Sequence, residues 1–86
     1  MALAFLSNMH AQVDRATLTG TVEDSAAKVI PGAHLAVVSQ ETGFRREART
    51  MDNGVYTITQ LPIGTYTVTV SQPGFRTVAV KDVRLG

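Results

Sequence analysis

Hydrophobic and polar residues alternate with a period of two along most of the chain from Ala16 onward. In the segment TLTGTV, Leu18, Gly20 and Val22 fall on one face and three threonines fall on the other. The segment TYTVTV has the same arrangement, with tyrosine and valine opposite threonine. Alternation in segments rich in Thr, Val and Tyr is typical of β-strands that turn one face to a core and the other to water.

The pattern predicts six strands and a short final stub, and no segment has the length and the 3.6-residue period of a helix. The predicted strands are about Ala16–Glu23, Ala33–Gln40, Phe44–Met51, Val55–Gln60, Thr65–Ser71 and Arg76–Lys81, followed by the stub Val83–Leu85. Short strands that are separated by turns at intervals of about 8–12 residues predict an all-β sandwich.

The segments between the predicted strands contain the residues that turns require. ETG and DNG place Gly43 and Gly54 where a left-handed backbone is expected. LPIG and QPG combine a proline that fixes φ with a glycine that permits a reversal. The longer segment Asp24–Gly32 predicts a crossover between two sheets.

The third predicted strand, FRREARTM, differs from the others because neither of its faces is cleanly apolar. Its charges predict a strand at the edge of a sheet, since Arg and Glu discourage pairing with a further strand. The alternative is a charged docking surface. The candidate interaction face is therefore formed by Arg45, Arg46, Glu47 and Arg49.

Two tyrosines are expected in the core, because Tyr56 and Tyr66 share a face with Ile58 and Val68. The hydroxyl of Tyr66 is further expected to bond to nearby backbone, as in a tyrosine corner. Phe75 follows a Pro-Gly pair and is expected to plug the end of the sandwich. With two tyrosines, three phenylalanines and no tryptophan, the chain has few aromatic side chains to spare for a sugar-binding surface.

Composition narrows the choice of partners. The 86 residues make one domain, and a formal charge of +1 gives no electrostatic reason to expect nucleic acid or an anionic membrane as partner. The absence of cysteine excludes disulfides and thiolate metal sites. No apolar run approaches the roughly 20 residues of a membrane-spanning helix.

The first 15 residues are interpreted as a leader, and residues 16–86 as the folded domain. An apolar patch, Ala2–Leu6, precedes small and polar residues, which predicts the remnant of a secretory signal peptide. Cleavage after Ala11 would leave Gln12 as the first residue. A plain leader and a structured N-terminal element are the alternatives.

The chain lacks the residue patterns that carry catalysis or metal binding. His10 and His34 have no neighbouring pattern of Asp, Glu or Cys, so no metal site is predicted. One Asp and one Asn in the DNG turn fall short of the about six to eight oxygens that Ca²⁺ takes, so Asp52 is expected to cap its own turn. The acidic residues are scattered, and no Ser or Cys is placed as a nucleophile. We therefore expect a protein that is not an enzyme and has no cofactor.

The segments LTGTVED, IPGAHLAV and TMDNGVYTITQLPIGTYTVTVSQPGF together resemble the carboxypeptidase regulatory-like domain, over about Ala16 to Leu85. The resemblance implies an Ig-like or prealbumin-like (transthyretin-like) Greek-key β-sandwich of about six to seven antiparallel strands. In such domains a segment like VRLG leads into one more strand, which closes a sheet. That final strand is expected to be missing here, and the sheet that it would close is expected to have an unpaired edge.

Within that family the chain is most similar to the N-terminal domains of bacterial TonB-dependent outer-membrane transporters. This resemblance implies a non-catalytic accessory module of a secreted or outer-membrane protein, located in the periplasm or cell envelope. The expected partner is a protein or the rest of a parent chain, and the unpaired edge is expected to permit self-association. The alternative function is a carbohydrate- or polymer-binding module.

Overall fold

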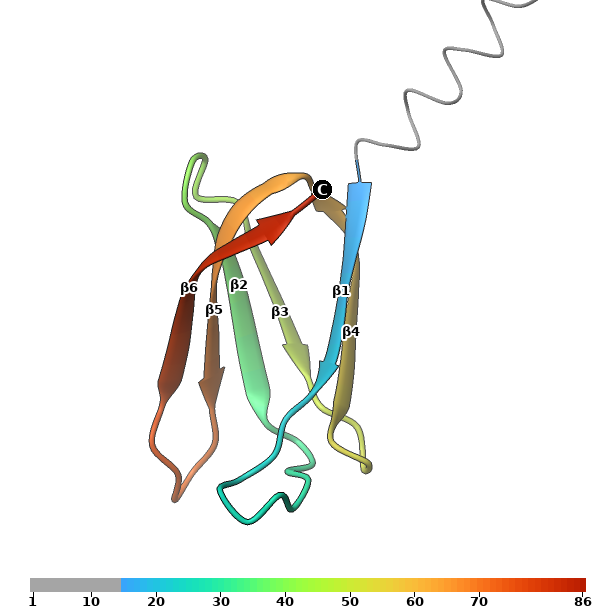
Figure 1. The fold of residues 1–86 in the computed structure, drawn as a ribbon, viewed down its shortest axis with the longest axis vertical. Coiled ribbons are helices and arrows are strands. Elements are labelled where there is room, and N and C mark those ends of the chain that lie inside the picture. The colour runs from blue at the N-terminus through green and yellow to red at the C-terminus, as the bar shows by residue number, and fades with distance from the viewer. Residues whose placement is uncertain (1–14) are drawn as a thin grey trace, which may run out of the picture.

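A computed structural model describes residues 15–86 and shows six β-strands and no helix in this range (Figure 1). The strands are β1 (Arg15–Thr21), β2 (His34–Ser39), β3 (Arg45–Arg49), β4 (Val55–Pro62), β5 (Gly64–Ser71) and β6 (Val78–Leu85). The predicted leader lies outside the described residues, except that Arg15 begins β1. Within residues 15–86, no helix is available to cross a membrane.

The strands form two antiparallel sheets. One sheet has the order β1-β4 and the other has the order β3-β2-β5-β6. The chain passes from the first sheet to the second through residues 24–32, which confirms the predicted crossover. It passes between the sheets again from β3 to β4 and from β4 to β5. The all-β sandwich predicted from the alternation of residues is thereby confirmed.

The last strand differs from the prediction. The expected strand Arg76–Lys81 and the expected stub Val83–Leu85 belong to one strand, β6, which begins at Val78. Its pairing with β5 shifts at Asp82, whose φ of 62° marks a bulge. A bulge lets a strand bend while its pairing continues, so the stub remains part of the same sheet. Residues 15–86 contain no seventh strand.

The core lies between the two sheets. Its buried members come from β2, β4 and β5, and they are Leu35, Val37, Ile58, Leu61, Tyr66 and Val68. Tyr66 is 1% exposed, and its hydroxyl donates to the carbonyl oxygen of Pro62 at 2.6 Å. This bond ties the end of β4 to β5, so the predicted tyrosine corner is confirmed. Tyr56 is half-buried and packs against the same core.

The DNG turn before β4 depends on Gly54. Its φ is +78°, and a Cβ there would lie 2.7 Å from Cβ of Val29 and 3.0 Å from the carbonyl oxygen of Val22. The predicted left-handed backbone is confirmed, as it is at Gly43. The prediction that Asp52 caps this turn is wrong. The side chain of Asn53 accepts the hydrogen bond from the Val55 amide instead (3.1 Å).

Candidate functional site

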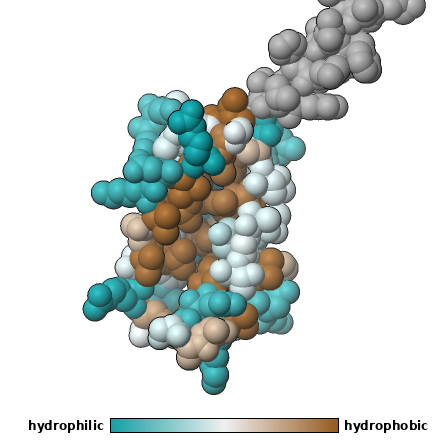
Figure 2. All heavy atoms as spheres, in the orientation of Figure 1, coloured by the Kyte–Doolittle hydropathy of each residue, from teal (hydrophilic) through white to brown (hydrophobic). Residues whose placement is uncertain are grey.

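An apolar groove is open between β1 and β6. In the register of β5 and β6, Val78 and Val80 pair with Val70 and Val68 and therefore share the face that is turned to the core. Val68 is 6% exposed, whereas Val78 and Val80 are 52% and 51% exposed. Figure 2 shows hydrophobic atoms in a band along this opening, between the sides that carry β6 and β1 in Figure 1. The two-stranded sheet thus leaves the first half of β6 uncovered, whereas Val83 and Leu85 in its second half pack against the core.

The edge of β1 that borders this open groove has unpaired peptide groups. The Val22 amide donates to the carbonyl oxygen of Gly54 on the β4 side (2.9 Å). Peptide groups alternate in direction along an antiparallel strand, so those of Thr19 and Thr21 point away from β4. No other strand among residues 15–86 pairs with β1 on that side.

The outer edge of β4 is occupied by an arginine. Arg46 extends from β3, and its guanidinium donates to the carbonyl oxygens of Thr59 (3.0 Å) and Gln60 (3.4 Å). This contact bridges the two sheets on the side opposite the groove. Two of the carbonyl groups that a further strand could use on β4 are therefore already bonded.

The two edges of the larger sheet also carry features that oppose pairing. The edge strand β3 presents Arg45, Glu47 and Arg49, and the edge strand β6 has the bulge at Asp82 beside Lys81. Charged side chains and bulges are the usual means by which proteins keep sheet edges from pairing. Between Ala16 and Thr21, β1 has neither a charge nor a proline. Over this stretch the free edge of β1 lacks the charged side chains that border the larger sheet and the arginine contact on β4, although its pairing with β4 shifts register between Ala16 and Leu18.

The structure divides the predicted charged face of β3. Arg45, Glu47 and Arg49 are exposed, whereas the half-buried Arg46 bridges the sheets as described above. Arg45 Nε donates to Glu47 Oε2 at 2.7 Å, and Glu47 Oε1 lies 2.9 Å from His34 Nε2. Arg49 donates to the carbonyl oxygen of Gly32 at 3.1 Å.

These contacts have an electrostatic consequence. The hydrogen bond with His34, followed by the hydrogen bond and charge of Arg45, holds the pKa of Glu47 below its ordinary value. The predicted position of β3 at a sheet edge is confirmed. Its role as an interaction face stays a prediction, although its charges already bond to one another and to backbone.

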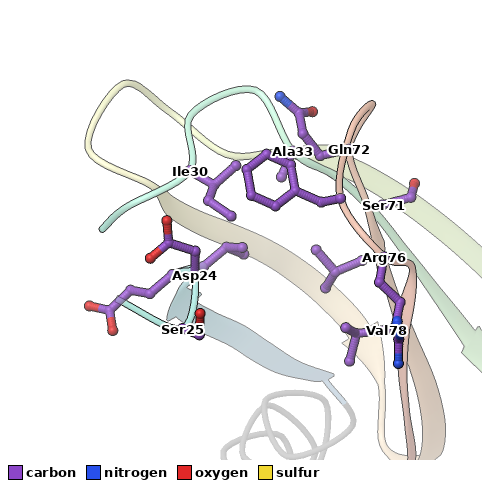
Figure 3. A pocket seen from close by; sticks show the side chains of 12 residues that line it. Asp24, Ser25, Ile30, Ala33, Ser71, Gln72, Arg76 and Val78 are labelled. Carbon is purple, nitrogen blue, oxygen red and sulfur yellow. The ribbon is translucent and has the colours of Figure 1, made fainter. Parts of the chain in front are cut away.

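A cavity of about 660 Å³ lies at one end of the groove. Its apolar lining includes Val22, Ile30, Phe75 and Val78, and Figure 3 shows Asp24 and Arg76 on opposite sides of it. Phe75 is 51% exposed, so the prediction that it plugs the end of the sandwich is wrong. Its ring lines an opening instead of filling one.

Sequence reasoning expected an unpaired edge but did not identify the strand or the groove. The signal was present in the uncharged TLTGT of β1, in contrast to the charged FRREAR segment. The alternation of residues shows that Val78 and Val80 share one face of their strand. It does not show whether another strand covers that face. In residues 15–86, no group of three or more His, Cys, Asp or Glu is placed to hold a metal ion.

Comparison with known protein families identifies one that matches the chain. The model of the carboxypeptidase regulatory-like domain matches residues 17–86, a range that includes nearly all of β1 and the whole of β2 to β6. No curated protein was found to match the chain. Domains of this family are β-sandwich modules that are generally non-catalytic, in agreement with the fold and the groove described above. Because the match covers far more than half of its length, the chain belongs to the carboxypeptidase regulatory-like domain family.

Proposed function

We propose that the chain is a non-catalytic interaction module of a bacterial secreted or outer-membrane protein, and that it binds an extended segment along β1. The observation that carries this proposal is the unprotected edge of β1 beside the open groove. In strand addition, main-chain hydrogen bonds supply affinity and alternate side chains fill pockets. The outward peptide groups of Thr19 and Thr21 offer those bonds, and the groove accepts the side chains.

Burial of the groove favours the addition of a strand. Val78 and Val80 each keep about half of their surface in contact with water. Full burial of a valine is worth about 1.5 kcal/mol or more, so covering the exposed halves of both valines stabilises a complex by roughly 1.5 kcal/mol. Main-chain hydrogen bonds along β1 add to this term, with about 0.5–1.5 kcal/mol for each.

The parent protein that best agrees with the sequence is a TonB-dependent outer-membrane transporter, with this chain as its N-terminal extension in the periplasm. Support comes from the family, and from the signal-like segment that ends just before β1. We expect export of the full chain to remove residues 1–11. Mass spectrometry of the periplasmic fraction should then give a protein that begins at Gln12, whereas an unprocessed cytoplasmic product would contradict this placement.

The test of strand addition uses a short peptide and one position in β1. The capped peptide KVTVTVTE is titrated into the isotope-labelled full chain, with the non-alternating peptide KVVTTVTE as control. NMR shifts are expected at Thr19, Thr21, Val78 and Val80. Thr19→Pro should abolish them, because proline removes the N–H that points to the free edge.

Thr19→Val is the matched control for that substitution. It keeps the N–H and removes only the hydroxyl, which donates to the carbonyl oxygen of Tyr56 at 3.0 Å. Binding should therefore survive in Thr19→Val. Shifts confined to Arg45, Glu47 and Arg49 would contradict the choice of β1 and favour the charged face.

Carbohydrate binding is the second candidate, and the half-exposed Phe75 beside Asp24 and Arg76 favours it. A sugar would use the exposed ring as a platform and the charged groups as hydrogen-bond partners. Titration with neutral oligosaccharides distinguishes the two functions. Shifts at Phe75 that are lost in Phe75→Ala would support sugar binding, whereas an unchanged spectrum would reject it.

A further inference from the structure

We propose that the segment added to β1 is β1 of a second copy of this chain, antiparallel and centred on Thr19. This inference rests on the proposed strand addition and names its partner. Such a pairing would join the two β1-β4 sheets into one continuous sheet. The two copies would be related by a twofold axis that passes through the pair of Thr19 residues.

The charges at the two ends of β1 complement each other in this arrangement. Arg15 lies four residues before Thr19, and Glu23 lies four residues after it. Both are exposed and fall in the same alternation as Thr19, with Arg15 at the start of β1 and Glu23 two residues past its end, where it bridges to Val29. Antiparallel pairing about Thr19 therefore places each Arg15 opposite Glu23 of the second copy, twice in the dimer, and opposite charges across strands stabilise a sheet.

The direction of the peptide groups agrees with the same centre. The pairing with β4 places the peptide groups of Thr19 and Thr21 outward, and Thr17 has the same parity at the point where that pairing shifts register. Centring on Thr19 aligns Thr19 with Thr19, and Thr17 with Thr21. A register that differs by one residue would set these groups opposite residues whose own groups point to β4, and the hydrogen bonds could not form.

On the inner face, a second β1 would meet the ring of Tyr56. Leu18 would lie opposite Gly20 of the second copy, and Gly20 presents no side chain at that point. The Tyr56 hydroxyl oxygen lies 2.6 Å from where a Cβ of Gly20 would stand, so the ring of Tyr56 covers the glycine. Leu18 of the second copy would pack beside this ring.

Symmetry brings the two grooves together. The open groove borders β1, so a twofold axis at Thr19 turns the groove of one copy toward the groove of the other. The exposed halves of Val78 and Val80 would then be covered in both copies. Because each copy uses the same edge, the assembly closes at a dimer and leaves no β1 edge free for growth into a filament.

The test is a charge exchange in the full chain, followed by analytical ultracentrifugation at low salt over a range of concentrations. The wild type should show a concentration-dependent dimer. Arg15→Glu and Glu23→Arg should each weaken it about tenfold, because two attractive pairs become repulsive. An equimolar mixture of the two variants should recover the dimer as a heterodimer, in which both pairs are again of opposite charge.

Control variants distinguish the loss of the Arg15–Glu23 pairs from a general effect of net charge or of unfolding. Arg49→Glu and Asp52→Arg make the same charge changes away from β1 and should leave association unchanged. The double variant Arg15→Glu with Glu23→Arg should dimerise as the wild type does. Failure of the mixture and of the double variant to associate would overturn the antiparallel register centred on Thr19.

Failure of this inference is distinguishable from failure of strand addition. A chain that stays monomeric at all concentrations, yet binds the alternating peptide through Thr19 and Thr21, retains strand addition and overturns the second copy as its partner. Undiminished dimerisation of the Thr19→Pro variant overturns the second copy as partner, because the dimer interface then lies elsewhere. Strand addition is overturned as well if the alternating peptide also fails to shift Thr19 and Thr21 in the wild type. Loss of the dimer in Thr19→Pro with retention in Thr19→Val supports both.

Discussion

Replacement of Tyr66 by alanine is expected to lower the free energy of unfolding by about 3 kcal/mol or more. Tyr66 is 1% exposed and belongs to the core cluster that joins β2, β4 and β5. Its removal leaves a cavity that the backbone of a small sandwich cannot close, and it also removes the bond to Pro62. Urea denaturation followed by circular dichroism measures the loss.

Tyr66→Phe separates the two contributions. It keeps the ring in the core and removes only the hydroxyl that donates to Pro62 at 2.6 Å. The expected loss is about 1 kcal/mol, the net worth of one such bond. Unchanged unfolding of Tyr66→Ala would contradict the place of Tyr66 in the core, and a full loss in Tyr66→Phe would assign the stability to the hydroxyl alone.

Gly54→Val should destabilise the fold through two effects at once. Any side chain there must adopt a φ of +78°, which costs roughly 1–2 kcal/mol. The new Cβ would also overlap Val29 and the carbonyl oxygen of Val22, and relief of such crowding costs roughly 1–3 kcal/mol more. We expect a thermal midpoint well below that of the wild type.

Gly43→Val is the matched control, because Gly43 has the same φ of +78° and nothing within 4 Å of its Cβ position. It should carry the cost of the backbone alone. The difference between the two variants then measures the crowding at the crossover. Equal losses would mean that residues 24–32 move aside freely and do not hold the DNG turn against β1.

Local rules predicted the strands and turns well because those features depend on neighbouring residues. The alternation in TLTGTV and TYTVTV places β1 and β5, and a glycine at a required left-handed position marks each of two turns. The continuation of β6 past Asp82 was not predicted, since a bulge is decided by pairing with β5. The choice of Asn53 over Asp52 as cap depends equally on backbone geometry, which the letters DNG do not fix.

The candidate site depends on the order of strands in space. The sequence marked Arg45, Arg46, Glu47 and Arg49 as one charged surface, but alternation turns Arg46 inward, where it bonds to β4. The unprotected edge belongs to β1, which is the neighbour of β4 and has no second neighbour among residues 15–86. No local pattern states which strand lies beside which, so the sequence predicted an open edge without locating it.

Hydrogen exchange at the Thr19 amide tests the central claim most directly. In dilute solution its N–H points to the free edge and should exchange rapidly, unlike the Val22 amide, which is bonded to Gly54. With rising concentration of the full chain, or with the alternating peptide added, the Thr19 and Thr21 amides should become protected together. Rapid exchange of Thr19 under every one of these conditions would contradict β1 as the site where a strand is added.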